Sequence, residues 1–152
     1  MPTRRDWLAA ASAAVALAVL SPRAALARAT RPLLRVRKNP GCGCCDNWVA
    51  HMKELGFDAT VVEDPDLHEY KRKLGVPREL VSCHTAEVDG YVIEGHVPGD
   101  LVQRIIREKP AITGLGVGGM PMGSPGMDGG RKDPYDVVAF KKDGSMMVYA
   151  HR

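Results

Sequence analysis

Three cysteines within four residues, Cys42, Cys44 and Cys45, constrain this chain more than any other feature. They follow a short β-type run at residues 33–37, which ends in residues typical of turns. They lead into residues 44–55, where apolar side chains recur at helical spacing. The cysteines are therefore predicted at a turn from a strand into a helix. Unpaired backbone N–H groups and the helix dipole stabilise thiolates at such a position.

The rest of the chain alternates between strand and helix patterns, which predicts an α/β fold. The expected elements, in order, are a strand at 33–37, a helix at 44–55, a strand at 57–62, a helix at 66–74, a hairpin at 84–94, a helix from 98 to 109, and a C-terminal hairpin at 135–140 and 146–150. Residues 110–134 contain eight Gly and four Pro with no periodicity, and we expect a long Gly/Met/Pro-rich loop there. We expect at least one of Met146 and Met147 to lie in the core.

Residues 1–27 have the three-part pattern of an export signal peptide. A charged start with Arg4 and Arg5 precedes an apolar run at 8–20, which is shorter than the roughly 20 residues needed to span a membrane. The arginine pair resembles a twin-arginine signal, and the general secretory route remains an alternative. We therefore expect one domain at residues 28–152, located in the bacterial periplasm and without a membrane span.

Charge excludes a simple nucleic-acid binder. The formal net charge of +3 owes much to the signal segment, since it falls to +1 once residues 1–27 are removed. The basic residues form no long run, and aromatic residues make up only 5% of the chain. We therefore expect no nucleic acid among the partners of this protein.

The cysteine spacing leaves several chemistries open. Cys42 and Cys45 form the C-x-x-C pair of dithiol redox sites, whereas Cys42 and Cys44 form a C-x-C pair suited to one soft metal. Cys83 can complete a four-sulfur site, because the segment after Val76-Pro77 passes beside the cysteine turn in a strand–helix–strand fold. A further interpretation is a pair of stabilising disulfides, as in other small exported domains.

Among metals, copper fits this cysteine set better than zinc. Soft sulfur selects Cu(I), zinc or iron–sulfur clusters over hard ions. The charge of four thiolates is balanced by several Cu(I) ions rather than by one divalent ion. Zinc sites usually pair two C-x-x-C knuckles, whereas this chain has one crowded turn and a single distant cysteine.

Other side chains are secondary candidates. His84 and His96 are candidate metal ligands because their segments can approach the cysteine turn. His51 lies two helical turns after Cys44, roughly 10 Å along the axis, which is too far to share a metal with it. Two roles are open to Met120, Met122 and Met127. They could bind Cu(I) through their thioether sulfurs, or they could fill gaps in an irregular loop.

Two further expectations concern residues outside the metal set. Trp48 is expected to pack on the sheet and to shield the thiols from water. His68 and His151 are expected at the surface.

Several motifs, in the same order, resemble the CopG-type family of small exported copper-resistance proteins. The resemblance extends over residues 34–149, and no part of the pattern is missing. The segments that carry it are Lys38-Asn39-Pro40-Gly41-Cys42-Gly43-Cys44-Cys45 with Trp48 and His51, Gly75-Val76-Pro77, Ser82-Cys83-His84-Thr85, Gly90-Tyr91 with Glu94-Gly95-His96-Val97-Pro98, and residues 119–127.

The resemblance implies a thioredoxin-like βαβ-αββα core followed by the Gly/Met/Pro-rich loop and the C-terminal hairpin. It also implies copper bound by Cys42, Cys44, Cys45 and Cys83 as a multinuclear Cu(I)–thiolate cluster. Redox activity between Cu(I) and Cu(II) would make Cys42 and Cys45 catalytic.

The expected function is therefore copper resistance or homeostasis in the periplasm, with copper ions and other copper-handling proteins as partners. Two alternatives remain. One is a metal-free thiol–disulfide oxidoreductase that uses Cys42 and Cys45, and the other is a copper carrier without turnover.

Overall fold

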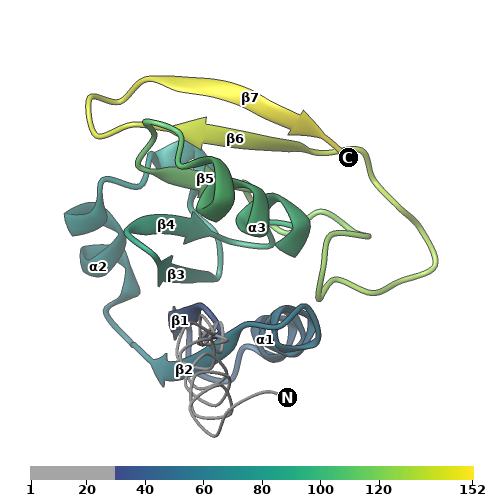
Figure 1. Cartoon of the computed structure of the whole chain (residues 1–152). Helices are drawn as coiled ribbons and strands as arrows, with labels where there is room; N and C mark the ends of the chain where they lie inside the picture. Colours follow the sequence, from purple (N-terminus) through teal and green to yellow (C-terminus); the bar gives the residue numbers. More distant parts are fainter. Residues whose placement is uncertain (1–29) are drawn as a thin grey trace, which may run out of the picture. The chain divides into compact units, whose positions relative to one another are not determined.

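A computed structural model of the chain describes residues 30–152. The expected signal peptide at 1–27 lies outside the described residues. The elements alternate as the sequence predicts, with one additional strand and one short 3₁₀ helix (Figure 1). They are β1 (Leu33–Lys38), α1 (Gly43–Glu54), β2 (Asp58–Glu63), α2 (Leu67–Leu74), the 3₁₀ helix η1 (Arg78–Leu80), β3 (His84–Val88), β4 (Tyr91–Glu94), α3 (Gly99–Glu108), β5 (Gly114–Gly116), β6 (Asp136–Phe140) and β7 (Met146–His151).

One seven-stranded mixed sheet organises these elements, in the order β2-β1-β3-β4-β5-β6-β7. β1 pairs parallel with β2 and antiparallel with β3, while β4 pairs antiparallel with β3 and parallel with β5. The C-terminal hairpin of β6 and β7 extends the sheet through β5, as Figure 1 shows. The predicted α/β class is confirmed, and the more detailed thioredoxin-like assignment stays a prediction.

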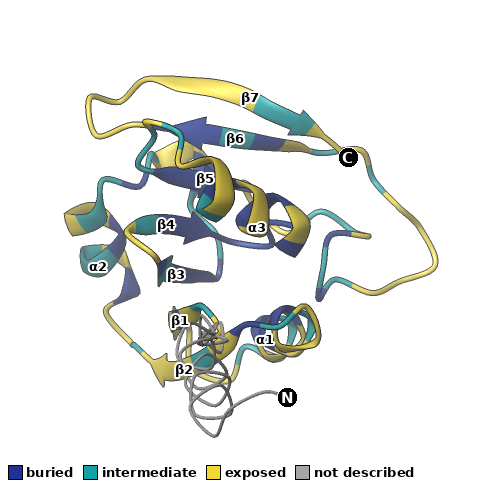
Figure 2. Cartoon of the chain, in the orientation of Figure 1, coloured by how far each residue is buried: buried dark blue, intermediate teal, exposed yellow. Residues whose placement is uncertain are grey.

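The apolar residues divide between the two faces of the sheet because strand side chains alternate. On β4, Ile93 belongs to the larger core with residues of α1 and α3, whereas its neighbour Val92 packs with residues near η1. Figure 2 shows buried residues along the middle strands and exposed ones on the outward sides of the helices. Two helices thus cover one face, and Val76 and Leu80 cover part of the other.

A glycine allows α1 and α3 to touch where α3 begins. A Cβ atom at Gly99 would lie 2.3 Å from Cδ1 of Leu55 and 2.9 Å from Sδ of Met52. Helix α2 ends at Gly75, whose φ of +74° is the left-handed conformation that glycine accepts without strain.

The sequence-based prediction of a continuous loop at 110–134 is wrong at its start. Gly114–Gly116 form strand β5 between β4 and β6. The short Gly-Leu-Gly run shows no side-chain alternation, but the absence of side chains is what permits close packing here. A Cβ at Gly114 would lie 1.9 Å from the backbone oxygen of Val92, and one at Gly116 would lie 2.9 Å from Leu80.

The expectation for the two methionines of the last hairpin is also wrong. Met146 and Met147 are 45% and 62% exposed, so neither belongs to the core. They lie at the start of β7, one of the two edge strands of the sheet, where a single neighbouring strand gives little cover.

No helix within residues 30–152 has both the length and the apolar character needed to cross a membrane.

The close packing around β5 predicts that Gly114→Ala destabilises the protein by about 1–3 kcal/mol, the usual cost of overpacking. The new methyl group would meet the backbone of Val92, which cannot rotate away. Urea unfolding measures the change. Gly130→Ala is the control, since a Cβ there meets nothing within 4 Å and should cost less than about 0.5 kcal/mol. A similarly small loss for Gly114→Ala would contradict this account of β5.

Candidate metal centre

The cysteine turn lies at the start of α1, as predicted. Cys42 is the N-cap residue and has an extended backbone, and Gly43 begins the helix. Lys38, at the end of β1, points its ammonium group at this turn: Nζ lies 3.4 Å from the carbonyl oxygen of Cys42 and 2.7 Å from Oδ1 of Asp46. The Lys38 side chain is only 7% exposed. It therefore connects the strand end to the first turn of the helix.

Four cysteine sulfurs converge at this point. All four Sγ atoms, from Cys42, Cys44, Cys45 and Cys83, lie within 4.8 Å of one another. Cys42 and Cys45 form a disulfide, and Cys44 Sγ lies 3.5 Å from that of Cys42 and 3.9 Å from that of Cys83. Cys44 and Cys83 are free thiols. The structure thus differs from the interpretation with two stabilising disulfides, and it places all four predicted sulfur ligands together.

The pairing of β1 with β3 explains why Cys83 lies beside the cysteine turn. The antiparallel ladder of β1 and β3 pairs Lys38 with His84, and the backbone N–H of Asn39 continues it by donating to the carbonyl oxygen of Cys83 at 3.1 Å. Cys83 is therefore held at the end of β1, where the cysteine turn begins.

Two buried histidines extend the site on the far side of Cys83. The Sγ atom of Cys83 lies 3.2 Å from Nε2 of His96 and 3.5 Å from Nδ1 of His84. Nδ1 of His96 lies 2.8 Å from the carbonyl oxygen of Pro125, which can only accept a hydrogen bond. Nδ1 therefore carries the proton, and the Nε2 lone pair faces Cys83. A backbone carbonyl that orients a histidine in this way is typical of metal sites.

Burial sets the protonation states of the site. It lowers the pKa of His84 well below its usual range, assisted by His96 and by the charge of Lys71. Burial also lowers the pKa of His96, against the opposing effect of the Pro125 hydrogen bond. It raises the pKa of Cys83 to about 11, together with the nearby Cys44. The metal-free site therefore holds neutral imidazoles and a protonated Cys83, so binding of a soft cation there releases a proton.

One nitrogen atom of the two buried histidines has no hydrogen-bond partner. Nε2 of His84 is buried and without a hydrogen bond in the described part of the chain. The His84 ring packs against Trp48, with 4.5 Å between ring centroids, and against His96 at 5.0 Å. Trp48 is itself buried and donates from Nε1 to the carbonyl oxygen of Val97, so its predicted packing on the sheet is confirmed. An unpaired buried nitrogen calls for an explanation, and a ligand is one.

The Gly/Met/Pro-rich loop packs on the cysteine turn. A Cβ at Gly126 would lie 2.7 Å from both the carbonyl oxygen of Cys44 and the amide nitrogen of Trp48. Met120 is 52% exposed, whereas Met122 and Met127 are half-buried. The loop therefore covers the start of α1, and a ligand role for its methionines stays a prediction.

The remaining histidines lie away from the sulfurs. His51 belongs to neither group of converging donors in residues 30–152 and lines a cavity together with Asp128. His151 is exposed and lies 2.6 Å from Asp136 through Nδ1, and His68 is also exposed. These placements agree with the expectations from the sequence.

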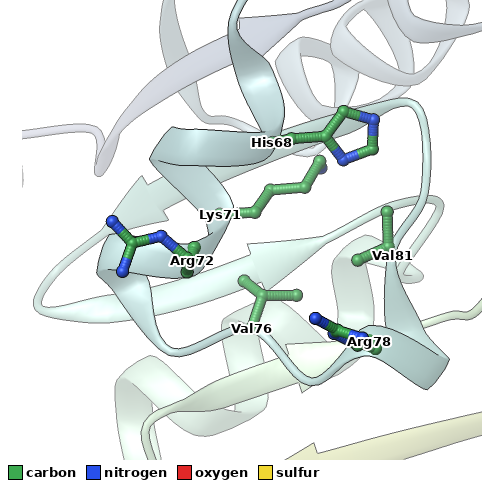
Figure 3. A pocket seen from close by; sticks show the side chains of 6 residues that line it. All are labelled: His68, Lys71, Arg72, Val76, Arg78 and Val81. Carbon is green, nitrogen blue, oxygen red and sulfur yellow. The ribbon is translucent and has the colours of Figure 1, made fainter.

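The cavity beside His68 is not part of the metal centre. It measures 480 Å³, lies between α2 and the segment around η1, and has no sulfur in its lining (Figure 3). Six residues line it: His68, Lys71, Arg72, Val76, Arg78 and Val81.

Two charged residues behind the site are not indicated by the sequence. Lys71 and Glu94 are buried and form an ion pair, and the Glu94 carboxylate accepts a hydrogen bond from the backbone N–H of Ser82, which precedes Cys83. The sequence predicts no role for either, since lysine and glutamate are normally exposed. Glu94 stands out only as part of a segment that carries the family resemblance.

Fold and site together define an α/β protein with a partly buried cluster of four cysteines and two histidines at the start of a helix, in an arrangement that could hold a metal ion. Comparison with known proteins places it more narrowly. Residues 80–127 match a protein family of unknown function, DUF411. No curated protein matches the chain.

Two solved structures are similar over most of the chain. The structure described as copper resistance protein CopG, form 2, is 39% identical with a TM-score of 0.76, over 80% of this chain and 98% of the other. Form 1 is 40% identical with a TM-score of 0.75, over 79% and 96% of the two chains. The chain belongs to the CopG copper-resistance family.

The buried histidines predict a pH-dependent stability of the metal-free protein. The pKa of His84 is lower in the folded than in the unfolded state, so below about pH 6.5 the unfolded state binds more protons and stability falls as pH falls. The slope should approach about 1.4 kcal/mol per pH unit for this one group.

Urea unfolding of wild type and His84→Gln between pH 7.5 and 5 measures this slope. The variant should lose less stability than the wild type over this range, because it lacks one of the two buried imidazoles that titrate. His68→Gln, at an exposed position, should behave as wild type. Equal slopes for wild type and His84→Gln would contradict the assignment.

Proposed function

We propose that this protein is an exported copper-resistance protein that binds Cu(I) through Cys42, Cys44, Cys45 and Cys83. One observation carries the proposal: four sulfurs from two distant segments lie within 4.8 Å of one another, and the fourth also meets two buried imidazoles. The solved CopG structures described as copper resistance proteins support copper as the metal. Periplasmic location rests on the expected signal peptide.

The donor set favours several Cu(I) ions over one divalent ion. Four thiolates around one zinc ion would leave a double negative charge in a largely buried site, where uncompensated charge is costly. Several monovalent ions balance the same sulfurs if each sulfur bridges two metals. Cys83 is placed for such bridging, because it belongs both to the four-cysteine group and to the group with His84 and His96.

Copper binding by all four sulfurs requires the disulfide to open. Reduction of Cys42–Cys45 takes two electrons and leaves two thiolates. A dithiol reductant can supply the electrons and become a disulfide itself. Two Cu(I) ions can also supply them and become two Cu(II) ions. The second reaction would give the protein a Cu(I)/Cu(II) redox activity, whereas a simple carrier would leave the copper oxidation state unchanged.

Anaerobic titration tests the binding. Reduced wild-type protein should take up more than one Cu(I) per chain, measured by competition with a chromogenic chelator. The triple variant Cys42→Ser, Cys44→Ser, Cys45→Ser should lose this uptake, because three of the four soft donors are gone. Met146→Leu, which removes an exposed thioether on β7, is the control and should bind as wild type. Uptake by the triple variant equal to that of wild type would refute the proposal.

The disulfide supports a second candidate function, thiol–disulfide exchange without metal. Cys42 is half-buried at the helix start, while Cys45 is fully buried, which is the arrangement of an attacking and a resolving thiol. In reduced protein the Cys42 thiolate would attack a client disulfide and release one client thiolate. Cys45 would then displace the second client sulfur and restore the Cys42–Cys45 bond.

A trapping experiment tests this second function. In a Cys44→Ser background, which removes the free thiol beside Cys42, Cys45→Ser should accumulate a mixed disulfide between Cys42 and a model disulfide peptide, seen by mass spectrometry, because the resolving thiol is missing. Cys42→Ser in the same background is the matched control and should trap none through the helix start. Absence of a trapped species in Cys45→Ser, with no turnover by wild type, would remove this candidate.

A further inference from the structure

A buried ion pair lies behind the metal centre. Lys71 on α2 and Glu94 at the end of β4 are 2% and 0% exposed, and Nζ of Lys71 lies 2.5 Å from Oε1 of Glu94. Thr85 joins the pair: its hydroxyl accepts from Lys71 at 2.7 Å and donates to Oε2 of Glu94 at 2.6 Å. The Lys71 side chain also borders the cavity beside η1 (Figure 3).

Stability alone gives a weak reason for such a pair. Removing two charges from water costs several kcal/mol per ion, and apolar residues of similar volume are often as stabilising or better. The surrounding residues are largely apolar on this face, where Val76, Leu80 and Val92 pack together. The pair therefore calls for a role other than filling the core.

The carboxylate of Glu94 holds the backbone next to Cys83. Its Oε1 atom accepts a hydrogen bond from the backbone N–H of Ser82 at 2.7 Å. Ser82 in turn donates from Oγ to the carbonyl oxygen of Gly119 at 2.6 Å. Glu94 thus holds the backbone of Ser82 in place, and Ser82 immediately precedes Cys83.

The same carboxylate lies at the start of the segment that carries His96. Gly95 follows it with a φ of +68°, and a Cβ there would lie 2.7 Å from Cβ of Ser82. The Ser82–Cys83 and Glu94–His96 segments therefore lie against each other, and Glu94 bonds across them. Lys71 orients that carboxylate by donating to it, and its ammonium group opposes the rise in the pKa of Glu94 that burial causes.

We infer that Lys71 and Glu94 are positioning residues of the copper site, which hold the Ser82–Cys83 backbone so that Cys83 Sγ faces both Cys44 and His96. The copper part of this inference rests on the proposed function. The pair acts through Cys83, so its loss should matter only while Cys83 is present. A merely structural ion pair would not show that dependence.

A double-mutant cycle separates the two roles. Glu94→Gln should weaken Cu(I) binding by about tenfold or more, the usual effect of removing a group that orients a ligand. Cys83→Ser should also weaken it, and the double variant should bind no more than about threefold more weakly than Cys83→Ser alone. Independent effects that multiply in the double variant would overturn the inference. Glu108→Gln, which removes the exposed carboxylate paired with Arg104, should bind as wild type.

A metal-free readout keeps the inference testable without copper. In the triple variant Cys42→Ser, Cys44→Ser, Cys45→Ser, Cys83 is the single thiol, and its alkylation by iodoacetamide can be timed by mass spectrometry. Adding Glu94→Gln should raise the alkylation rate several-fold, because Cys83 loses its fixed, buried position; adding Glu108→Gln should not. An unchanged rate would overturn the positioning role. If wild type bound no Cu(I), the proposed function would fail, while this rate would still decide the role of Glu94.

A second variant addresses folding. Lys71→Met and Glu94→Leu, combined with Thr85→Val, replace the buried charges and the hydroxyl between them by apolar side chains. This variant should stay folded, because the Ser82 amide is then the one donor that loses its Glu94 acceptor. It should nevertheless show the same faster alkylation of Cys83, measured in the same background. A stable apolar variant with wild-type Cys83 reactivity would also overturn the inference.

Discussion

The hydrogen bond from the amide of Asn39 to the carbonyl oxygen of Cys83 connects the two parts of the site. It extends the antiparallel ladder of β1 and β3 one step beyond the strand. In an antiparallel pair, the start of one strand lies beside the end of the other. The beginning of β3 therefore lies beside the cysteine turn, and the site depends on the direction of these two strands.

The same pairing brings in the histidines and the buried charges. His84 is the first residue of β3, and Thr85 pairs with Glu94 at the end of β4. His96 lies two residues beyond that end, where its ring reaches Cys83. Polar groups that would be costly to bury singly are thus gathered at one end of the sheet, where most of them bond to one another and Nε2 of His84 is left without a partner among the described residues.

The sequence predicts the helices and strands whose apolar residues recur at regular spacing. It also predicts that Cys83 lies beside the cysteine turn. The helical spacing of Trp48, Val49 and Met52 places α1, and the strand–helix–strand order brings the distant cysteine back. Strand β5 could not be predicted, because Gly114 and Gly116 have no side chains and so show no alternation of apolar and polar residues. The strand forms because its backbone packs closely against neighbouring residues.

The ion pair and the side-chain orientations at the site depend on tertiary contacts, which no local sequence pattern indicates. Lys71 and Glu94 are 23 residues apart, and each alone resembles a surface residue. The orientation of His96 comes from the carbonyl of Pro125, within a loop that has no periodicity. The local sequence thus indicates which side chains could bind a metal. The long-range packing decides which atom of each side chain faces the site.

The contact between Trp48 and His84 has a spectroscopic consequence. Of the two tryptophans in the chain, Trp48 is the one that lies within residues 28–152, and its indole is buried against an imidazole that neighbours Cys83. Its emission is therefore a built-in optical probe of this pocket, sensitive to the charge of one ring and to any heavy ion beside it. In a chain without Trp7, we expect this emission to follow proton uptake by the His84 ring and the binding of any metal beside it, without a dye or a label.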